Sequence, residues 1–309
     1  MSELPFSKRA KLWASKFPLR LNRAYYSRMG MCDFNPSGTD IFQEDWDNLL
    51  ILDACRYDTF AEISNLPGTL EKRISRASTT DEFMRANISQ KTFEDTVYVT
   101  AQPSIHVTEG VDPTFHDVID LWEDRWDDEL RTVPPEVVTE AAIEVNKEYP
   151  DKRLFIHYLQ PHYPFIGETG RKYFNYPGYD TPLESDETSE KFWDTVGTRI
   201  NDVPEDIVKR AYRENLEETL PHVEELITTI PGKSVVTADH GEMLNDWARP
   251  VPYRLYGHPA GLYTRELVEV PWHTYTNGDR PEINDGKSSE LDEVDKEVVE
   301  DRLQDLGYA

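Results

Sequence analysis

Continuous runs of apolar and β-branched residues recur along the chain, and polar residues follow several of them directly. Three such runs lie at residues 48–53, 153–160 and 234–238, and a further strand-like run lies at 96–101. A run without alternation is typical of a strand covered on both faces, as the strands of a parallel sheet are. We therefore predict buried strands at the first three positions and another strand at the fourth.

Helical periodicity separates these strands. Residues 134–149 repeat apolar side chains at helical spacing, and residues 204–230 form a long amphipathic pattern that leads into the strand at 234–238. A helix between two strands is typical of a βαβ unit with a right-handed crossover. The chain is therefore predicted to have an α/β fold, and its 309 residues suffice for one large domain.

The C-terminal part is predicted to contain two smaller elements. Residues 266–275 resemble a strand, and Pro271 within it favours a position at the edge of the sheet. Residues 277–290 are interpreted as an acidic, solvated linker. A terminal helix is predicted at residues 292–306, with its apolar side packed on the body.

Acidic residues and a histidine stand where two of the predicted strands end. Asp53 closes the run at 48–53, and Asp239 and His240 follow the run at 234–238. In a parallel sheet both strand ends reach the same edge, which is where ligands of α/β folds bind. A carboxylate beside an imidazole there is a candidate metal site. The alternative is that Asp239 caps a helix and His240 is an exposed loop residue.

Three neighbouring hydroxyl side chains, Ser78, Thr79 and Thr80, precede two acidic residues and an apolar pair that resembles the beginning of a helix. Unpaired backbone N–H groups and the positive end of the helix dipole favour an oxyanion or a nucleophile at such a position. The alternative is an ordinary helix cap, in which Ser or Thr precedes acidic residues.

Three further histidines differ in their placement. His157 lies inside the strand predicted at 153–160 and is interpreted as a core residue. His162 lies just after that strand between two prolines, and His258 lies between two glycines. A histidine beyond a strand end is better placed for chemistry than one inside a strand.

The charge of the chain is strongly negative. Asp and Glu number 59 against 33 Lys and Arg, which gives a formal net charge of -26 at pH 7. Diffuse negative charge repels nucleic acid, so no nucleic-acid partner is expected. The same charge fits adaptation to high salt, as in halophilic archaea, because salt screens self-repulsion. Cys32 and Cys55 are the only cysteines, and residues 1–22 lack the apolar core of a signal peptide, so we expect a cytoplasmic protein.

The first 30 residues break this charge pattern. They contain one acidic residue, Glu3, against seven basic residues, namely Lys8, Arg9, Lys11, Lys16, Arg20, Arg23 and Arg28. Aromatic and leucine side chains are interleaved with them, so one hypothesis is that residues 8–28 contact an anionic membrane surface peripherally. The alternative is a helix that packs on the acidic body of its own chain.

Three ordered motifs resemble those of the sulfatase-like branch of the alkaline phosphatase superfamily. Residues 51–58, I-L-D-A-C-R-Y-D, are similar to its D-D-x-R-x-D strand end, and residues 161–165, P-H-Y-P-F, to its P-H-x-P-F motif. Residues 237–242, T-A-D-H-G-E, are similar to its S/T-x-D-H-G-E motif. The resemblance extends from about residue 45 to the C-terminus and implies an α/β/α sandwich around a mainly parallel sheet.

Two departures from the sulfatase pattern bear on the chemistry. Ala54 stands where the family has the second acid of the D-D pair. The C-x-P-S-R or C-x-A-x-R box, whose Cys or Ser becomes formylglycine, is missing. Residues 77–83, A-S-T-T-D-E-F, instead resemble the T-S-D-x-E-F-M box of lipoteichoic acid synthase-type phosphoglycerol transferases. On that resemblance Ser78 takes the place of the nucleophile, with Thr79 as the alternative.

The resemblance implies a metal-dependent hydrolase or transferase that acts on phosphate or sulfate esters through a covalent Ser or Thr intermediate. One divalent cation, Mn²⁺, Mg²⁺ or Zn²⁺ with Ca²⁺ as a further option, would be held by Asp53, Ser78, Asp239 and His240. His162 or His258 would bind ester oxygens or protonate the leaving group.

The remaining expectations concern Arg56, the substrate and the domains. Arg56 would either contact the oxyanion or pair with Asp58. The substrate would be a small-molecule, lipid or glycan ester. Residues 1–44 form a basic segment and linker, 45–276 a catalytic domain, and 277–309 an acidic linker and helix. Ala54 and the missing box support a second hypothesis, a catalytically silent relative that binds or organises other components in surface-glycan or lipid assembly.

Overall fold

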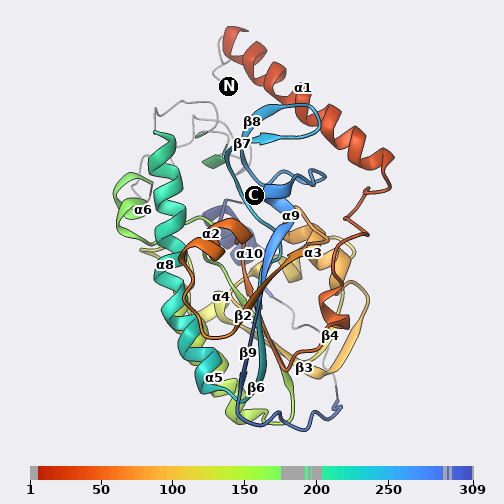
Figure 1. Cartoon of the computed structure of the whole chain (residues 1–309), viewed down its shortest axis with the longest axis vertical. Coiled ribbons are helices and arrows are strands. Elements are labelled where there is room, and N and C mark those ends of the chain that lie inside the picture. The colour runs from red at the N-terminus through yellow and green to blue at the C-terminus, as the bar shows by residue number, and fades with distance from the viewer. Residues whose placement is uncertain are drawn as a thin grey trace.

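A seven-stranded sheet forms the centre of the molecule (Figure 1). The structure is a computed structural model that describes residues 6–174, 192–193, 196, 204–287, 291 and 294–307, without the side chains of residues 6–16. The strands are β1 (Asn48–Leu52), β2 (Thr69–Ile74), β3 (Thr92–Thr100), β4 (Thr114–Asp120), β5 (Arg153–Tyr158), β6 (Gly232–Thr237) and β9 (Glu269–Asn277). Their order across the sheet is β2-β9-β6-β1-β5-β3-β4.

The sheet is mainly parallel, as the resemblance implied. β6, β1, β5, β3 and β4 pair in parallel, whereas β9 is antiparallel to both of its neighbours. In the centre, Leu52 of β1 lies beside Tyr158 of β5, and Ile51 lies beside Thr237 of β6. These three strands therefore end at one edge of the sheet, and the polar residues that follow them meet there.

The prediction that the strand around Pro271 lies at the edge of the sheet is wrong. β9 lies between β6 and β2, and Pro271 pairs with Lys72 of β2. The pairing of β9 with β6 ends at His273, so β6 does not pair with β9 at Pro271. The missing N–H group of the proline is tolerated because that side of the strand needs no donor there.

Two hydrophobic cores cover the two faces of the sheet. Successive residues of β1 alternate between them, with Leu50 and Leu52 in one core and Leu49 and Ile51 in the other. The first core includes side chains of α5 (Pro135–Glu148), α8 (Glu205–Thr229) and α10 (Lys296–Asp305). The second core includes Trp46 and side chains of α3 (Thr80–Asn87). Helices on both faces make the fold an α/β/α sandwich.

Shorter elements surround the sheet. They are α2 (Tyr57–Ile63), α4 (Leu121–Asp124), α6 (Glu168–Tyr173), α9 (Arg265–Val268), and the 3₁₀ helices η1 (Ile41–Gln43) and η2 (Pro103–His106). A hairpin of β7 (Met243–Ala248) and β8 (Tyr253–Gly257) and the helix α1 (Phe6–Arg28) lie together at the top of Figure 1. Within the described part of the chain, no helix has the length and apolar character required to cross a membrane.

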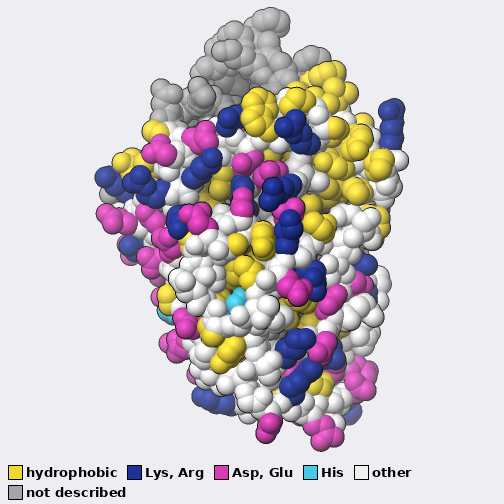
Figure 2. Space-filling view, in the orientation of Figure 1, with side chains coloured by type: hydrophobic (Ala, Val, Ile, Leu, Met, Phe, Trp, Pro, Cys, Tyr) yellow, Lys and Arg dark blue, Asp and Glu magenta, His cyan; other side chains and the backbone are white. Residues whose placement is uncertain are grey.

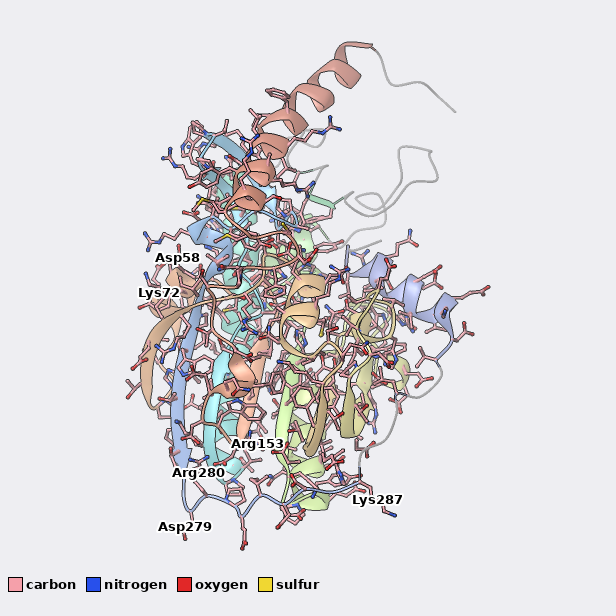
Figure 3. The ribbon with its side chains drawn as sticks, turned by 90° about the vertical axis from the view of Figure 1, so that its right-hand side faces the viewer. Asp58, Lys72, Arg153, Asp279, Arg280 and Lys287 are labelled. Atoms are coloured by element: carbon pink, nitrogen blue, oxygen red, sulfur yellow. The ribbon has the colours of Figure 1, made fainter. Side chains whose placement is uncertain are left out.

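The segment after β9 crosses the opposite end of the molecule. Figure 3 shows this segment running along the bottom from Asp279 and Arg280 to Lys287. Arg280 forms ion pairs with Asp47 at 2.7 Å and with Asp45 at 2.8 Å, both just before β1. The predicted solvated linker is therefore held against the sheet in this part, at the end that lies far from the predicted site.

Candidate metal centre

Two fully buried aspartates meet at the carboxyl edge of the sheet. Asp53 follows β1, and Asp239 follows β6. Nε2 of Gln102 donates to Oδ2 of Asp53 at 2.9 Å. The backbone N–H groups of Ala54 and His240 donate to Oδ1 of Asp239 at 3.0 and 2.8 Å. These hydrogen bonds fix the orientation of both carboxylates.

His240 lies beside both carboxylates. Its Nε2 is 3.3 Å from Oδ2 of Asp239 and 3.7 Å from Oδ1 of Asp53. Its Nδ1 is 2.8 Å from the carbonyl oxygen of Gly241, which can only accept, so Nδ1 carries the proton and donates it. Burial lowers the pKa of His240, so the neutral form with a lone pair on Nε2 is favoured. This is the form of histidine that binds metals.

The hydroxyl group of Thr80 faces the same group of side chains. Thr80 is the first residue of α3, and its Oγ1 donates to Oδ2 of Asp239 at 2.9 Å. The same oxygen is 3.3 Å from Nε2 of His240. An oxygen at a helix N-terminus is also close to backbone N–H groups that have no partner within the helix. Thr80 is therefore the hydroxyl that the fold brings to the aspartates.

The sequence-based assignment of Ser78, with Thr79 as the alternative, differs from this geometry. Oγ of Ser78 donates to Oε2 of Glu82 at 2.9 Å and lies 3.3 Å from the carbonyl oxygen of Pro259. Thr79 is the N-cap of α3, and its hydroxyl accepts from the N–H group of Glu82 at 3.3 Å. The ordinary helix cap considered above therefore applies to Thr79. Ser78 was assigned from the resemblance to a family motif, whereas the start of α3 at Thr80 determines which hydroxyl faces the edge of the sheet.

His157 also belongs to this centre, although the sequence placed it in the core. Asp53, His157 and Asp239 each offer one ligand atom, and these atoms lie within 4.8 Å of one another. Nδ1 of His157 is 3.0 Å from the hydroxyl of Tyr98, whereas Nε2 is buried and has no hydrogen-bond partner. Burial lowers the pKa of His157 to about 4, so its imidazole is neutral. A continuous apolar run does not reveal the face to which one histidine within it points.

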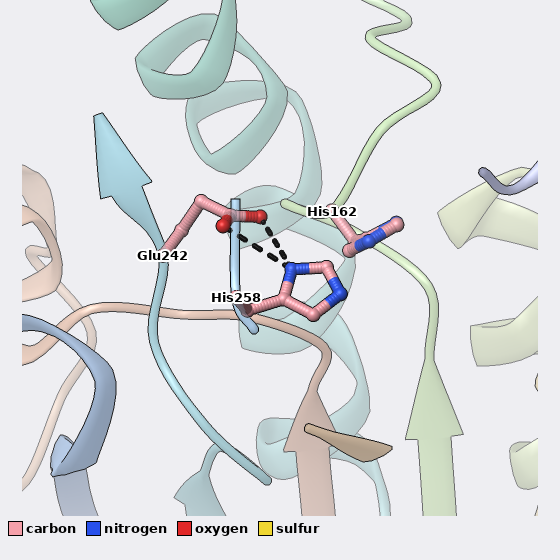
Figure 4. Close-up of side chains that lie close together, drawn as sticks. All are labelled: His162, Glu242 and His258. Carbon is pink, nitrogen blue, oxygen red and sulfur yellow. Dashed lines mark hydrogen bonds and ion pairs between the residues drawn. The ribbon is translucent and has the colours of Figure 1, made fainter. Parts of the chain in front are cut away.

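A second group of three side chains lies next to the first. Figure 4 shows His162, Glu242 and His258, whose ligand atoms also lie within 4.8 Å of one another. The fully buried Glu242 is 3.0 Å from Nδ1 of His258. The ring centroid of His258 is 4.6 Å from that of His240 and 5.0 Å from that of His162. The sequence predicted both histidines, and the missed residue Glu242 was visible as the last letter of the T-A-D-H-G-E motif.

The pKa values of the two histidines of this second group are shifted in opposite directions. Burial, together with the neighbouring His258 and His240, lowers the pKa of His162 well below its usual value. Burial also acts to lower the pKa of His258, but the charge and hydrogen bond of Glu242 outweigh burial, and the pKa is raised. The side chain of His258 is 11% exposed, whereas that of Glu242 is fully buried. Glu242 therefore favours the protonated form of His258, on the more open side of the centre.

Arg56 is engaged by the protein itself. Its Nε and Nη2 donate to the two carboxylate oxygens of Asp58 at 2.9 and 2.6 Å. Its Nη1 donates to Asp246 at 2.6 Å and to the carbonyl oxygen of Glu242 at 3.0 Å. Of the two roles expected for Arg56, the structural pair with Asp58 is present, and the bond to Asp246 connects Arg56 to β7.

Ala54 contributes to the candidate metal centre through its backbone, not through its side chain. Its φ angle is 59°, in the left-handed region that residues other than glycine rarely adopt. In this conformation its N–H group reaches Asp239, while its carbonyl oxygen accepts a hydrogen bond from the hydroxyl of Tyr212 at 2.7 Å. The position where the sulfatase-like family has an acid therefore orients a neighbouring carboxylate instead of supplying one.

The side chains of the first group fit a divalent cation. Two buried carboxylates that lie close together are unfavourable unless positive charge compensates them. His240 compensates them weakly because burial favours its neutral form. Nε2 of His157 is a buried nitrogen without a hydrogen-bond partner, as a metal ligand would be in the absence of the metal. Oxygen donors combined with imidazole nitrogen suit Mn²⁺, Mg²⁺ and Zn²⁺ alike.

No protein-family model matches the chain, and no curated protein matches it in sequence. Several solved structures are similar to it in fold. The C-terminal periplasmic domain of EcEptC from Escherichia coli, in complex with Zn, is 14% identical with a TM-score of 0.44, over 78% of this chain and 76% of that chain. The phosphonate monoester hydrolase SpPMH from Silicibacter pomeroyi is 14% identical with a TM-score of 0.35. The match covers 76% of this chain and 68% of that chain. A protein in the alkaline phosphatase superfamily from Vibrio parahaemolyticus is 13% identical with a TM-score of 0.37. The match covers 92% of this chain and 72% of that chain.

Proposed function

We propose that the chain is a metal-dependent hydrolase or transferase of phosphate esters in which Thr80 is the nucleophile. The observation that carries this proposal is the contact of the Thr80 hydroxyl with Asp239 and His240, which lies beside Asp53. A hydroxyl held beside a metal-binding group is suited to attack on the ester of an oxyacid. A threonine cannot be converted to formylglycine, which favours phosphate esters over the sulfate esters that formylglycine enzymes cleave.

The cation would be held by Asp53, Asp239 and His240 with the Thr80 oxygen, and His157 is a further donor. When bound, it would lower the pKa of a coordinated hydroxyl and offset the charge of the ester oxygens. Asp239 accepts the hydrogen bond of Thr80 and so orients the hydroxyl for attack.

The first chemical step forms a bond from the Thr80 oxygen to phosphorus and breaks the bond from phosphorus to the leaving alkoxide. The hydroxyl proton of Thr80 passes to Asp239, which accepts its hydrogen bond, and returns to the Thr80 oxygen when the phosphoryl group later leaves it. His258, whose pKa is raised, donates a proton to that alkoxide. Water or an acceptor alcohol then displaces the phosphoryl group from Thr80, and His258, now neutral, accepts the proton of this second nucleophile. Water gives hydrolysis, and an alcohol gives transfer.

The test is turnover of aryl phosphomonoester, phosphodiester and sulfate substrates with Mn²⁺, Mg²⁺ or Zn²⁺ supplied. Thr80→Val preserves the shape of the side chain but removes the nucleophile, so turnover should fall at least about a thousandfold. Ser78→Ala is the matched control and should stay within about tenfold of the wild type, because it removes a hydrogen bond and not the nucleophile. Intact mass after mixing with substrate should show a phosphoryl adduct in the wild type that Thr80→Val lacks.

Two results would contradict the proposal. Loss of turnover in Ser78→Ala with normal turnover in Thr80→Val would return the nucleophile to Ser78. A wild-type protein that binds metal but turns over no substrate of the panel would favour the catalytically silent relative that Ala54 suggested. Preferential cleavage of the sulfate substrate would leave the assignment of the site residues unchanged but would make sulfate esters the substrate class.

A further inference from the structure

One side of α1 exposes a row of large apolar side chains. Phe17, Leu21, Tyr25 and Met29 are 52%, 43%, 45% and 61% exposed. Their spacing of four residues places them in one line along the helix and its C-terminal end. Figure 2 shows hydrophobic side chains gathered over this part of the molecule, with basic side chains among them. A single exposed apolar side chain is ordinary, but a contiguous row indicates a contact surface.

The other side of α1 is fixed to the body. The side-chain amide of Asn22 donates to the carbonyl oxygen of Val251 at 3.0 Å and accepts from the N–H group of the same residue at 2.7 Å. The ring of Tyr26 packs edge-on against Tyr263, with centroids 5.5 Å apart. The apolar row therefore faces away from the protein, because the opposite face of α1 packs against the body through Asn22 and Tyr26.

The charge around this row is opposite to that of the whole chain. Arg20 and Arg28 are exposed on α1 next to the apolar row. Lys8, Arg9, Lys11 and Lys16 lie in the preceding part of the same helix. Salt limits electrostatic attraction to roughly 8–10 Å, so a surface that touches α1 senses this local positive charge more than the net charge of -26.

We propose that α1 binds the protein to an anionic lipid surface. Phe17, Leu21 and Tyr25 would enter the boundary between headgroups and acyl chains, and Arg20 and Arg28 would contact the acidic headgroups. This combination of an apolar row with flanking arginines is typical of helices that lie in the plane of a membrane. A second copy of the chain is a poorer partner because its own α1 carries the same positive charge.

The attachment of α1 also relates the lipid surface to the metal centre. Nε of Arg23 donates to the carbonyl oxygen of Ala260 at 2.7 Å, two residues after His258. The helix is thereby joined to the loop that carries the more exposed side of the centre. A consequence, which rests on the proposed function, is that the ester substrate is itself lipid-bound.

The test is flotation of the full chain with vesicles, which needs no catalytic turnover. We expect binding to vesicles that contain phosphatidylglycerol and much weaker binding to pure phosphatidylcholine at about 0.1 M salt. Replacing Phe17, Leu21 and Tyr25 together by Ser should reduce binding at least about tenfold. Replacing Arg20 and Arg28 by Gln should reduce binding to the anionic vesicles roughly tenfold to thirtyfold.

Tyr173→Ser is the matched control, since Tyr173 is an exposed tyrosine of α6, 38% exposed, outside the apolar row. It should bind vesicles like the wild type. All variants change exposed side chains, so their melting temperatures should match that of the wild type. Absence of wild-type binding to anionic vesicles would overturn the proposal, as would unchanged binding of the triple Ser variant. A dimer in sedimentation that the triple Ser variant loses, without vesicle binding, would assign the row to a second copy instead.

Discussion

Thr79 and Thr80 carry the same side chain, yet the start of α3 gives them different roles. The hydroxyl of Thr79 caps the helix by accepting from the N–H group of Glu82, whereas that of Thr80 donates to Asp239. An N-cap residue has extended backbone angles and the next residue has helical ones, so neighbouring side chains leave the backbone in different directions. The cluster of hydroxyl side chains could therefore be singled out from the sequence, but which of them faces Asp239 depended on the backbone angles at the start of α3.

His157 illustrates a second limit at the scale of single residues. Its burial inside a strand was predicted correctly, but burial does not distinguish a packed histidine from a ligand. The distinction rests on Nε2, which is buried without a hydrogen-bond partner, and on the proximity of Asp53 and Asp239. Those facts require the arrangement of neighbouring strands, which no local pattern contains.

A variant of this residue should weaken metal binding. His157→Phe keeps a ring of similar size but removes the nitrogen that faces the aspartates, so we expect metal affinity to fall about tenfold to a hundredfold. Calorimetric titration of the metal-free protein with Mn²⁺ or Zn²⁺ measures this. His222→Phe, on the outer part of α8, is the control and should leave the affinity unchanged. Equal affinities of the wild type and His157→Phe would show that His157 is only a packed core residue.

At the scale of elements, the cap of α3 should contribute to stability separately from the chemistry. Thr79→Ala removes the side-chain acceptor for the N–H group of Glu82, so the free energy of unfolding should fall by about 1 kcal/mol. Urea denaturation of the metal-free protein measures the change. Thr79→Ser retains the acceptor and should stay close to the wild type. A full loss of turnover in Thr79→Ala at normal stability would instead point to Thr79 as the nucleophile.

The strands that could be predicted are those that lie in the middle of the sheet. β1, β5 and β6 are covered on both faces and are almost completely buried, and each contains a run of apolar residues. No strand was predicted at β2, whose residues T-L-E-K-R-I alternate irregularly and are largely exposed. The edge position of β9 was expected from Pro271 alone, and β2, which was not predicted, pairs with the side of β9 that faces away from β6.

For the whole molecule, the metal should stabilise the fold. A ligand that binds only the folded chain, at a free concentration about 100 times its Kd, adds about 2.7 kcal/mol. In a chain of 309 residues that corresponds to a rise in Tm of roughly 4 °C, reversed by a chelator. Thermal unfolding with and without Mn²⁺ or Zn²⁺ measures this rise.

Two variants separate this effect from unspecific ion binding to an acidic protein. The double variant Asp53→Asn, Asp239→Asn should lose the metal-dependent rise. Its metal-free Tm should not fall, because two buried negative charges are removed. Asp117→Asn, which changes a carboxylate elsewhere, should retain the rise. The same rise in all three proteins would show that the aspartates do not hold the metal.

The location of the candidate site at the sheet edge could be predicted from the sequence, but most contacts between its side chains could not. Aspartates and histidines after parallel strands must meet at one edge, so Asp53, Asp239, His240 and His162 could be grouped from the sequence. Ala54 and Glu242 were visible in the motifs, but their contacts to Asp239 and His258 depend on turns that the motifs do not describe. The likeness to lipoteichoic acid synthase-type transferases and the adaptation to high salt stay predictions.

The metal centre draws its side chains from β1, α3, β5 and the end of β6, so no fragment of the chain contains it. On a ribosome, Asp53 and Thr80 emerge long before Asp239 and His240, and the cation has no complete set of donors until β6 has been inserted beside β1. We therefore expect the cation to bind only after β6 has joined the sheet. A proteolytic cut that separates α3 from β6 should release the ion even where each piece keeps its helices and strands.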